Sequence, residues 1–166
     1  MRKIIMMAAA AIAVAGCEVK PDGDTSPASQ NAEPLTQAQA EKIVTGAEAA
    51  WSSGRIEAVM ANYADGAVVF DTSTLPPTTD RNVQASGNAA FLTMKPADFR
   101  VDPRHVQLLD DDTIVASGVL SFTANAGAAR QLMRTRYSQV YQRRADNSWK
   151  IVHEHMSAPP PGTQLP

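Results

Sequence analysis

Apolar residues recur at helical spacing after residue 34, and this period predicts the first elements of the chain. Thr36 and Gln39 have the spacing of a capping box, and the apolar period that follows continues until Gly54. A shorter run with the same period covers residues 56–66. A third short helix is predicted over residues 87–95, where Pro96 follows. The pattern therefore predicts three helices.

The apolar period changes to two in the second half of the chain. A short strand is predicted at residues 67–70, and the polar, proline-containing stretch 71–86 is predicted to be a loop. Four long segments rich in β-branched and aromatic residues follow, separated by turn residues, at 99–109, 113–124, 132–144 and 149–157. We expect an α+β fold in which three helices pack on a curved antiparallel sheet.

A turn at Asp146-Asn147 would sort the last two strands into two faces. Residues that face each other in a hairpin share a face, and with this turn their numbers add to about 293. One predicted face carries Thr135, Tyr137, Gln139, Tyr141, Val152, Glu154 and Met156. The other carries Arg136, Ser138, Val140, Trp149, Ile151, His153, His155 and Ser157. A slip of one residue would exchange partners between the faces.

Length and charge limit the domain count and the class of partner. The chain has 166 residues, enough for one domain, which we place at residues 35–158. Its 15 Lys and Arg residues against 17 Asp and Glu residues give a net charge of −2, without a basic stripe. A nucleic-acid partner is therefore not expected.

The N-terminal segment predicts that the protein is located in the cell envelope. Residues 1–16 combine a short basic start with an apolar run too short to span a bilayer, as in a secretory signal peptide. The small residues before Cys17, the single cysteine, resemble a bacterial lipobox. That resemblance implies acylation of Cys17, palmitate included, and a periplasmic, lipid-anchored protein. Residues 17–34 would then be a flexible linker, and residues 159–166 a proline-rich tail.

The C-terminal strands resemble the SnoaL-like family of the nuclear transport factor 2-like superfamily. The resemblance rests on residues 136–138 and 149–157, the second with the sequence WKIVHEHMS, and on the helix-to-strand passage 54–69. The same ending is similar to the association domain of calcium/calmodulin-dependent protein kinase II. The resemblance implies a cone-shaped pocket between helices and sheet, and it leaves the activity open because this fold has unrelated functions.

Part of the resemblance concerns ketosteroid isomerase and a proton-transfer site. Asp71 falls at the position of the general base in that family, whereas Ala47 occupies the position of its oxyanion-stabilising tyrosine. A base without such a donor is a poor isomerase. Asp71 and Glu154 are the candidate catalytic residues of an isomerase, cyclase or hydrolase, with Arg136 or Tyr137 as polariser. Asp71 as an ordinary loop or capping residue is the alternative.

The remaining chemistry favours binding or self-association. The predicted ligand pocket consists of Trp51, Tyr63, Phe70, Phe91, Tyr137, Gln139, Glu154 and Met156. No cofactor is predicted. No metal site is predicted either, because His153 and His155 share a strand face without a third ligand. Trp149 and Ile151 on the outward face predict a homodimer through the sheet. An envelope structural protein with a vestigial pocket is a third hypothesis.

Overall fold

A computed structural model of the protein describes residues 34–72 and 76–158. The predicted signal peptide, Cys17 and the proline-rich tail lie outside the described residues, as does all but the last residue of the linker. None of the helices in the described ranges has the length and apolar character that crossing a membrane requires.

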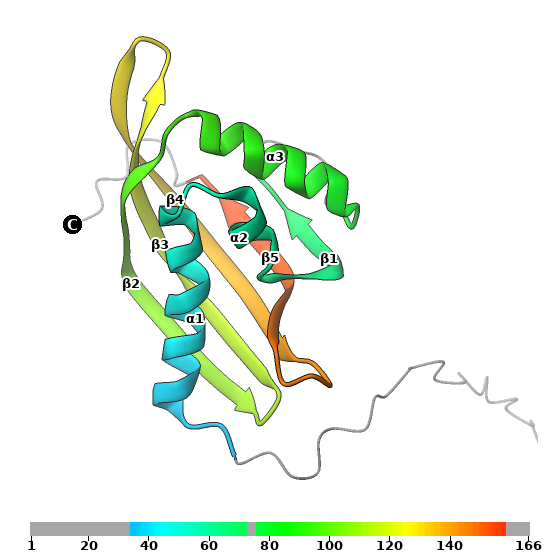
Figure 1. The fold of residues 1–166 in the computed structure, drawn as a ribbon. Helices are drawn as coiled ribbons and strands as arrows, with labels where there is room; N and C mark the ends of the chain where they lie inside the picture. The colour runs from blue at the N-terminus through cyan, green and yellow to red at the C-terminus, as the bar shows by residue number, and fades with distance from the viewer. Residues whose placement is uncertain (1–33, 73–75, 159–166) are drawn as a thin grey trace, which may run out of the picture.

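Five strands form one sheet, and helices pack against it, as the predicted α+β class requires (Figure 1). The helices are α1 (Gln37–Ser52), α2 (Ile56–Met60) and α3 (Arg81–Thr93). The strands are β1 (Tyr63–Phe70), β2 (Ala97–Asp110), β3 (Thr113–Ala126), β4 (Ala129–Arg143) and β5 (Trp149–Ser157). The order across the sheet is β1-β5-β4-β3-β2, with β1 parallel to β5 and the other pairs antiparallel. A strand was predicted at residues 67–70, but its start at Tyr63 and its parallel pairing with β5 were not.

The predicted start of α1 is confirmed in detail. The Thr36 hydroxyl accepts from the backbone N–H of Gln39, and the Gln39 side chain accepts in return from the backbone N–H of Thr36. Figure 1 shows α1 running along one face of the sheet, with α3 across one end and the β3–β4 hairpin projecting beyond it. Ala40 and Val44 are the fully buried residues of α1 and belong to the main core. The face of the sheet that packs against α1 is therefore the inner face.

Two boundaries differ from the prediction near the middle of the chain. Helix α2 ends at Met60 rather than near residue 66, because β1 begins at Tyr63 and pairs with β5. Helix α3 begins at Arg81, within the stretch predicted to be a loop, with Asp80 as its N-cap. Its first turns have little apolar period. Polar contacts hold them instead, since Gln84 donates to the carbonyls of Ala67 and Thr78.

The predicted pairing of β4 with β5 holds for only part of the hairpin. Val140 faces His153, in the predicted register, but Tyr141 faces Ile151, so Val152 is an extra residue in β5. Beyond this bulge the faces exchange. Ile151 is buried in the core beside Tyr141, and Trp149 packs against the same core under the Arg143 guanidinium. The prediction that Trp149 and Ile151 face outward is wrong.

Candidate functional site

Two adjoining cavities lie between the helices and the inner face of the sheet. The smaller, of about 280 Å³, is lined by residues of α1, α2 and all five strands. The larger, of about 430 Å³, lies under α3. Trp51, Leu120 and Met156 line both cavities. The two spaces therefore meet along these three side chains.

A chain of buried hydrogen bonds centred on Glu154 forms one wall of the smaller cavity. Glu154 is 4% exposed, and the Tyr63 hydroxyl lies 3.0 Å from its Oε1 and 2.9 Å from its Oε2. Gln139 Nε2 donates to the same Oε2, and the Tyr141 hydroxyl donates to Gln139 Oε1 at 2.6 Å. The network orients the Glu154 carboxylate from two neighbouring strands, β1 and β4.

Burial dominates the protonation of this network. Desolvation raises the pKa of Glu154 above its ordinary value, although hydrogen bonds from Gln139 and Tyr63 act in the opposite direction. The negative charge of Asp71 raises it further. Desolvation and the nearby Glu154 charge also raise the pKa of Tyr63, so its hydroxyl stays protonated and continues to donate. A carboxyl group with a raised pKa at a cavity wall is a typical feature of a functional site.

A second polar cluster lines the smaller cavity, around Glu48. Arg104 Nη1 contacts Glu48 Oε2 at 2.6 Å and Thr45 Oγ1 at 3.0 Å, and the Tyr137 hydroxyl donates to Glu48 Oε1 at 2.8 Å. Desolvation, followed by its hydrogen bond to Glu48, raises the pKa of Tyr137. Glu48 is thus an ion-paired carboxylate, whereas Glu154 has only neutral donors.

A bulge in β2 places Arg104 in this position. Val101 faces Leu120 but Arg104 faces Gly118, so β2 has one residue more than β3 between these pairs. The extra residue turns Arg104 to the inner face, where it can reach α1. Gly118 is required beneath the bulge, because a Cβ atom there would lie 2.6 Å from the Pro103 carbonyl oxygen and 3.1 Å from Tyr137 Cε1.

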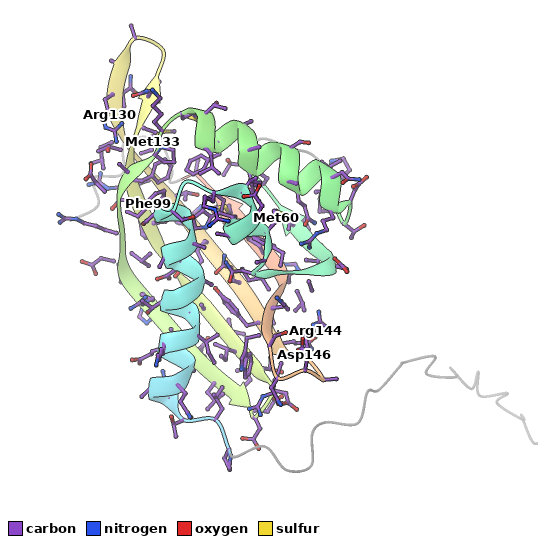
Figure 2. The ribbon with its side chains drawn as sticks, viewed as in Figure 1. Met60, Phe99, Arg130, Met133, Arg144 and Asp146 are labelled. Carbon is purple, nitrogen blue, oxygen red and sulfur yellow. The ribbon has the colours of Figure 1, made fainter. Side chains whose placement is uncertain are left out.

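Three aromatic rings and three methionines line the larger cavity, together with small and polar residues. Phe91 contacts Trp51 and Phe122 edge to face, with centroids 5.3 and 5.1 Å apart, and Phe122 contacts Phe99 at 5.7 Å. Figure 2 shows Phe99 and Met133 near the end of the sheet from which the β3–β4 hairpin projects. The charged residues that line this cavity are Asp71 and Arg134.

The sequence of this chain matches a known protein family. Residues 41–161 match the family model described as a SnoaL-like domain, which covers well over half of the chain. The chain belongs to the SnoaL-like domain family. The predicted resemblance to this family is therefore confirmed. A search of curated proteins finds no match.

Solved structures support the fold of this SnoaL-like protein. One, from Xanthomonas campestris, is described as a calcium/calmodulin dependent protein kinase II association domain, and it is 30% identical over 76% of this chain and 91% of its own, with a TM-score of 0.67. A protein from Pseudomonas putida described as NTF2-like and of unknown function is 21% identical over 76% and 90%, with a TM-score of 0.63. One from Parabacteroides distasonis, described as a ketosteroid isomerase, is 18% identical over 78% and 95%, with a TM-score of 0.62. The last two similarities concern the fold alone.

Seven of the eight predicted pocket residues line one or both cavities of this SnoaL-like domain. Tyr63, Tyr137, Gln139 and Glu154 line the smaller one, Phe91 lines the larger one, and Trp51 and Met156 line both. Asp71 lines the larger cavity. Phe70 is not among the lining residues of either cavity, and its ring lies 5.7 Å from His153 and 5.5 Å from His155. Whether these residues bind a ligand stays a prediction.

Two residues of the site were not predicted. Glu48 and Arg104 form the second polar cluster, yet neither belongs to a motif. Tyr141, predicted on the same face as Gln139 and Glu154, supports the first network by donating to Gln139. The alternation of residues along β2 could not place Arg104 on the inner face, because the bulge in β2 reverses the face on which it lies.

The predicted histidine pair lies on the outer face of the sheet. His153 and His155 pair with Val140 and Ser138 across β4, away from both cavities. Within the ranges 34–72 and 76–158, no cluster of three or more His, Cys, Asp or Glu side chains could hold a metal ion. Arg136, predicted as a polariser, contacts the Ala158 carbonyl at 3.4 Å.

Proposed function

We propose that this SnoaL-like protein binds a small, mainly apolar molecule across the two cavities, which together form the cone-shaped pocket implied by its family. Ligand pockets are commonly about 300–1,000 Å³, mostly apolar, with few polar groups that fix orientation. The two adjoining volumes together fall within that range, and apolar side chains form much of their lining. The buried Glu154 carboxylate, held by hydrogen bonds at the wall of this mainly apolar space, is the observation that carries the proposal.

A cavity-filling pair of variants tests this function. The neutral probe phenylbutanol would be titrated into the full chain and followed by saturation-transfer NMR. Ala90 lines the larger cavity, whereas its neighbour Ala89 does not, and both are exposed residues of α3. We expect Ala90→Leu to weaken binding by about tenfold, equivalent to about 1.4 kcal/mol, and Ala89→Leu to leave it unchanged. Absence of binding to the natural chain, or equal losses in both variants, would overturn the proposal.

Proton transfer is a second candidate function, favoured by the two carboxyl groups at the cavity walls. Glu154, with its raised pKa, lines the smaller cavity, and Asp71 lines the adjoining one. Such a group could accept a proton beside a carbonyl. In heavy water, the natural chain would then speed deuterium uptake into the α-position of phenylbutanone, and Glu154→Gln would abolish that effect. Equal rates of deuterium uptake with and without the protein would contradict proton transfer, and ligand binding would then be the remaining proposal.

A lipid anchor remains part of the proposed function. We propose that Cys17 is acylated and tethers the domain on the periplasmic side of a bacterial membrane, since stable anchoring takes about two acyl chains. Expression with an alkyne analogue of palmitate should label the natural chain, and Cys17→Ser should remove the label and release the protein from membranes. Equal labelling of both chains would contradict acylation at Cys17.

Self-association through the outer face of the sheet is the proposed partner interaction. Trp149 and Ile151 no longer support it, but Val115, Val119 and Val140 lie on the face opposite α1 and are only half-buried. Ser138, exposed at the centre of this face, pairs with His155 and Ser117. Sedimentation should show a dimer that Ser138→Arg dissociates and Ser86→Arg, on exposed α3, does not. A monomeric natural chain would refute the dimer.

A further inference from the structure

We propose that the ligand is an organic cation, with its ammonium group against Glu154 Oε1 and its apolar body extending past Trp51 into the larger cavity. This assignment rests on the proposed binding function and names the chemical class of the ligand. It follows from the charge, the free hydrogen-bonding capacity and the aromatic surroundings of one buried carboxylate.

The first step is the difference between the two carboxylates of the smaller cavity. Glu48 has a cationic partner, because Arg104 Nη1 lies 2.6 Å from its Oε2. Glu154 is almost fully buried, and within the described parts of the chain no Lys, Arg or His side chain lies at ion-pair distance from it. A buried carboxylate without a cation is costly, so it either binds a proton or binds a cation. The cavity beside it has room for a cation from outside.

The second step is the unequal use of the two carboxylate oxygens. Oε2 accepts from Gln139 Nε2 and from the Tyr63 hydroxyl at 2.9 Å, whereas Oε1 is reached only by the same Tyr63 hydroxyl at 3.0 Å. Tyr63 has one hydrogen to share between the two oxygens, and an ionised carboxylate has about four acceptor sites. Oε1 therefore keeps the capacity to accept from a ligand N–H.

The third step is the aromatic lining of the same cavity. Trp51, Tyr63, Tyr137 and Phe99 line the same cavity as Glu154. Aromatic faces attract ammonium groups, and the attraction increases when the group is desolvated. Trp51 also lines the larger cavity, where Phe91 and Phe122 continue the apolar surface. A cation with an aryl or alkyl body would thus place its ammonium group in the smaller cavity with Glu154 and the aromatic rings, and its apolar body in the larger cavity.

The other charged groups around the site do not oppose a cation. Arg104 faces the smaller cavity, but Glu48 neutralises it. Asp71 and Arg134 both line the larger cavity, one of each sign. The negative charge of Asp71 also acts on Glu154, where it raises the pKa. Of the two carboxylates in the smaller cavity, Glu48 is balanced by Arg104, whereas Glu154 in its ionised form has no cationic side chain at ion-pair distance among the described residues.

A matched pair of probes tests the proposal. Phenylbutylamine and phenylbutanol have the same skeleton and differ in the terminal group, which is cationic in the amine at neutral pH. Both would be titrated into the full chain at pH 8, followed by saturation-transfer NMR and calorimetry. We expect the amine to bind at least about tenfold more tightly than the alcohol.

Two variants show which carboxylate is responsible. Glu154→Gln should bring the amine down to the affinity of the alcohol, whereas Glu57→Gln, at an exposed carboxylate of α2 that lines neither cavity, should keep the preference for the amine. Equal binding of both probes to the natural chain would overturn the cation proposal while leaving the binding function intact. Failure of both probes to bind would overturn both. A preference that survives in Glu154→Gln, or that is lost equally in Glu57→Gln, would also overturn the proposal.

A measurement on the unaltered protein keeps the proposal testable if Glu154→Gln does not fold. The amine stays cationic below about pH 10, and Tyr63, Tyr137 and Tyr141, whose pKa values are raised, stay neutral. Because the pKa of Glu154 is raised by burial, its carboxylate gains a proton at a higher pH than an ordinary glutamate, so the preference for the amine over the alcohol should decline as the pH is lowered from 8 to 4. A preference that is constant over this range would count against Glu154 as the binding group.

Discussion

The two cavities of this protein differ in how some of their side chains are held in place. In the smaller cavity, Glu154, Gln139 and Tyr63 are hydrogen-bonded to one another and held between strands. In the larger cavity, Met94 and Met133 lie among aromatic rings. Methionine adapts its shape readily, whereas a satisfied polar network has one arrangement. The difference indicates that the smaller cavity orients a ligand and the larger one tolerates variation in its body.

Gly118→Ala should have the largest effect on stability, because it disturbs the packing of the smaller cavity and not that of the larger one. Its new Cβ would lie 2.6 Å from the Pro103 carbonyl oxygen and 3.1 Å from Tyr137 Cε1, so the β2 bulge and the Tyr137 ring must move. We expect a loss of about 3 kcal/mol in the free energy of unfolding, measured by urea denaturation. The matched control is Gly46→Ala in α1, where nothing lies within 4 Å and a gain of about 0.5–1 kcal/mol is expected. Similar effects at both glycines would contradict the tight packing at Gly118.

Removal of single hydroxyls should rank the two polar walls of the smaller cavity. Tyr63→Phe leaves the buried Glu154 with Gln139 as its donor, and we expect a loss of about 2 kcal/mol in unfolding free energy. Tyr137→Phe leaves Glu48 with its Arg104 ion pair, and a loss of about 1 kcal/mol is expected. Urea denaturation at pH 7 measures both. A larger loss in Tyr137→Phe would reverse the ranking.

The sequence predicts the fold better than it predicts the polar clusters of the smaller cavity. The Thr36 capping box, the four long strands and the inner positions Tyr137, Gln139, Tyr141 and Glu154 follow from period and turn residues alone. The two bulges do not, because each depends on a register that only the paired strand defines. Arg104 was therefore missed, and Ile151 was assigned to the wrong face.

The start of α3 shows a second limit of sequence reasoning. Period indicates helices through apolar residues, but the first turns of α3 are held by polar contacts to other elements, such as Gln84 to the Ala67 carbonyl. Asp80 before the helix is a good N-cap and was the available signal. It was outweighed by the neighbouring prolines. Long-range polar contacts of this kind are invisible in a single sequence.

The pH dependence of stability should distinguish Glu154 from the exposed acids. Because its pKa is raised in the folded state, the folded chain binds more protons than the unfolded one between the ordinary Glu pKa and the raised value. Ionisation of Glu154 therefore lowers the free energy of unfolding as the pH rises through that window, by about 1.4 kcal/mol for each pH unit that the window spans. Urea denaturation from pH 4 to 8 should show this decline, and Glu154→Gln should remove it. An identical pH profile in the variant would mean that Glu154 is ionised equally in both states.

The smallest effect is expected from a methionine of the larger cavity. Met94→Leu conserves volume, and neighbouring side chains can adjust around it, so the unfolding free energy should fall by less than about 1 kcal/mol. The affinity for phenylbutanol should change by less than about twofold. Gln139→Leu is the counterpart in the smaller cavity; it removes a donor to Glu154 and should cost about 2 kcal/mol. If Met94→Leu were as damaging as Gln139→Leu, the larger cavity would be as rigidly specified as the smaller one, and tolerance for varied ligand bodies would have to be abandoned.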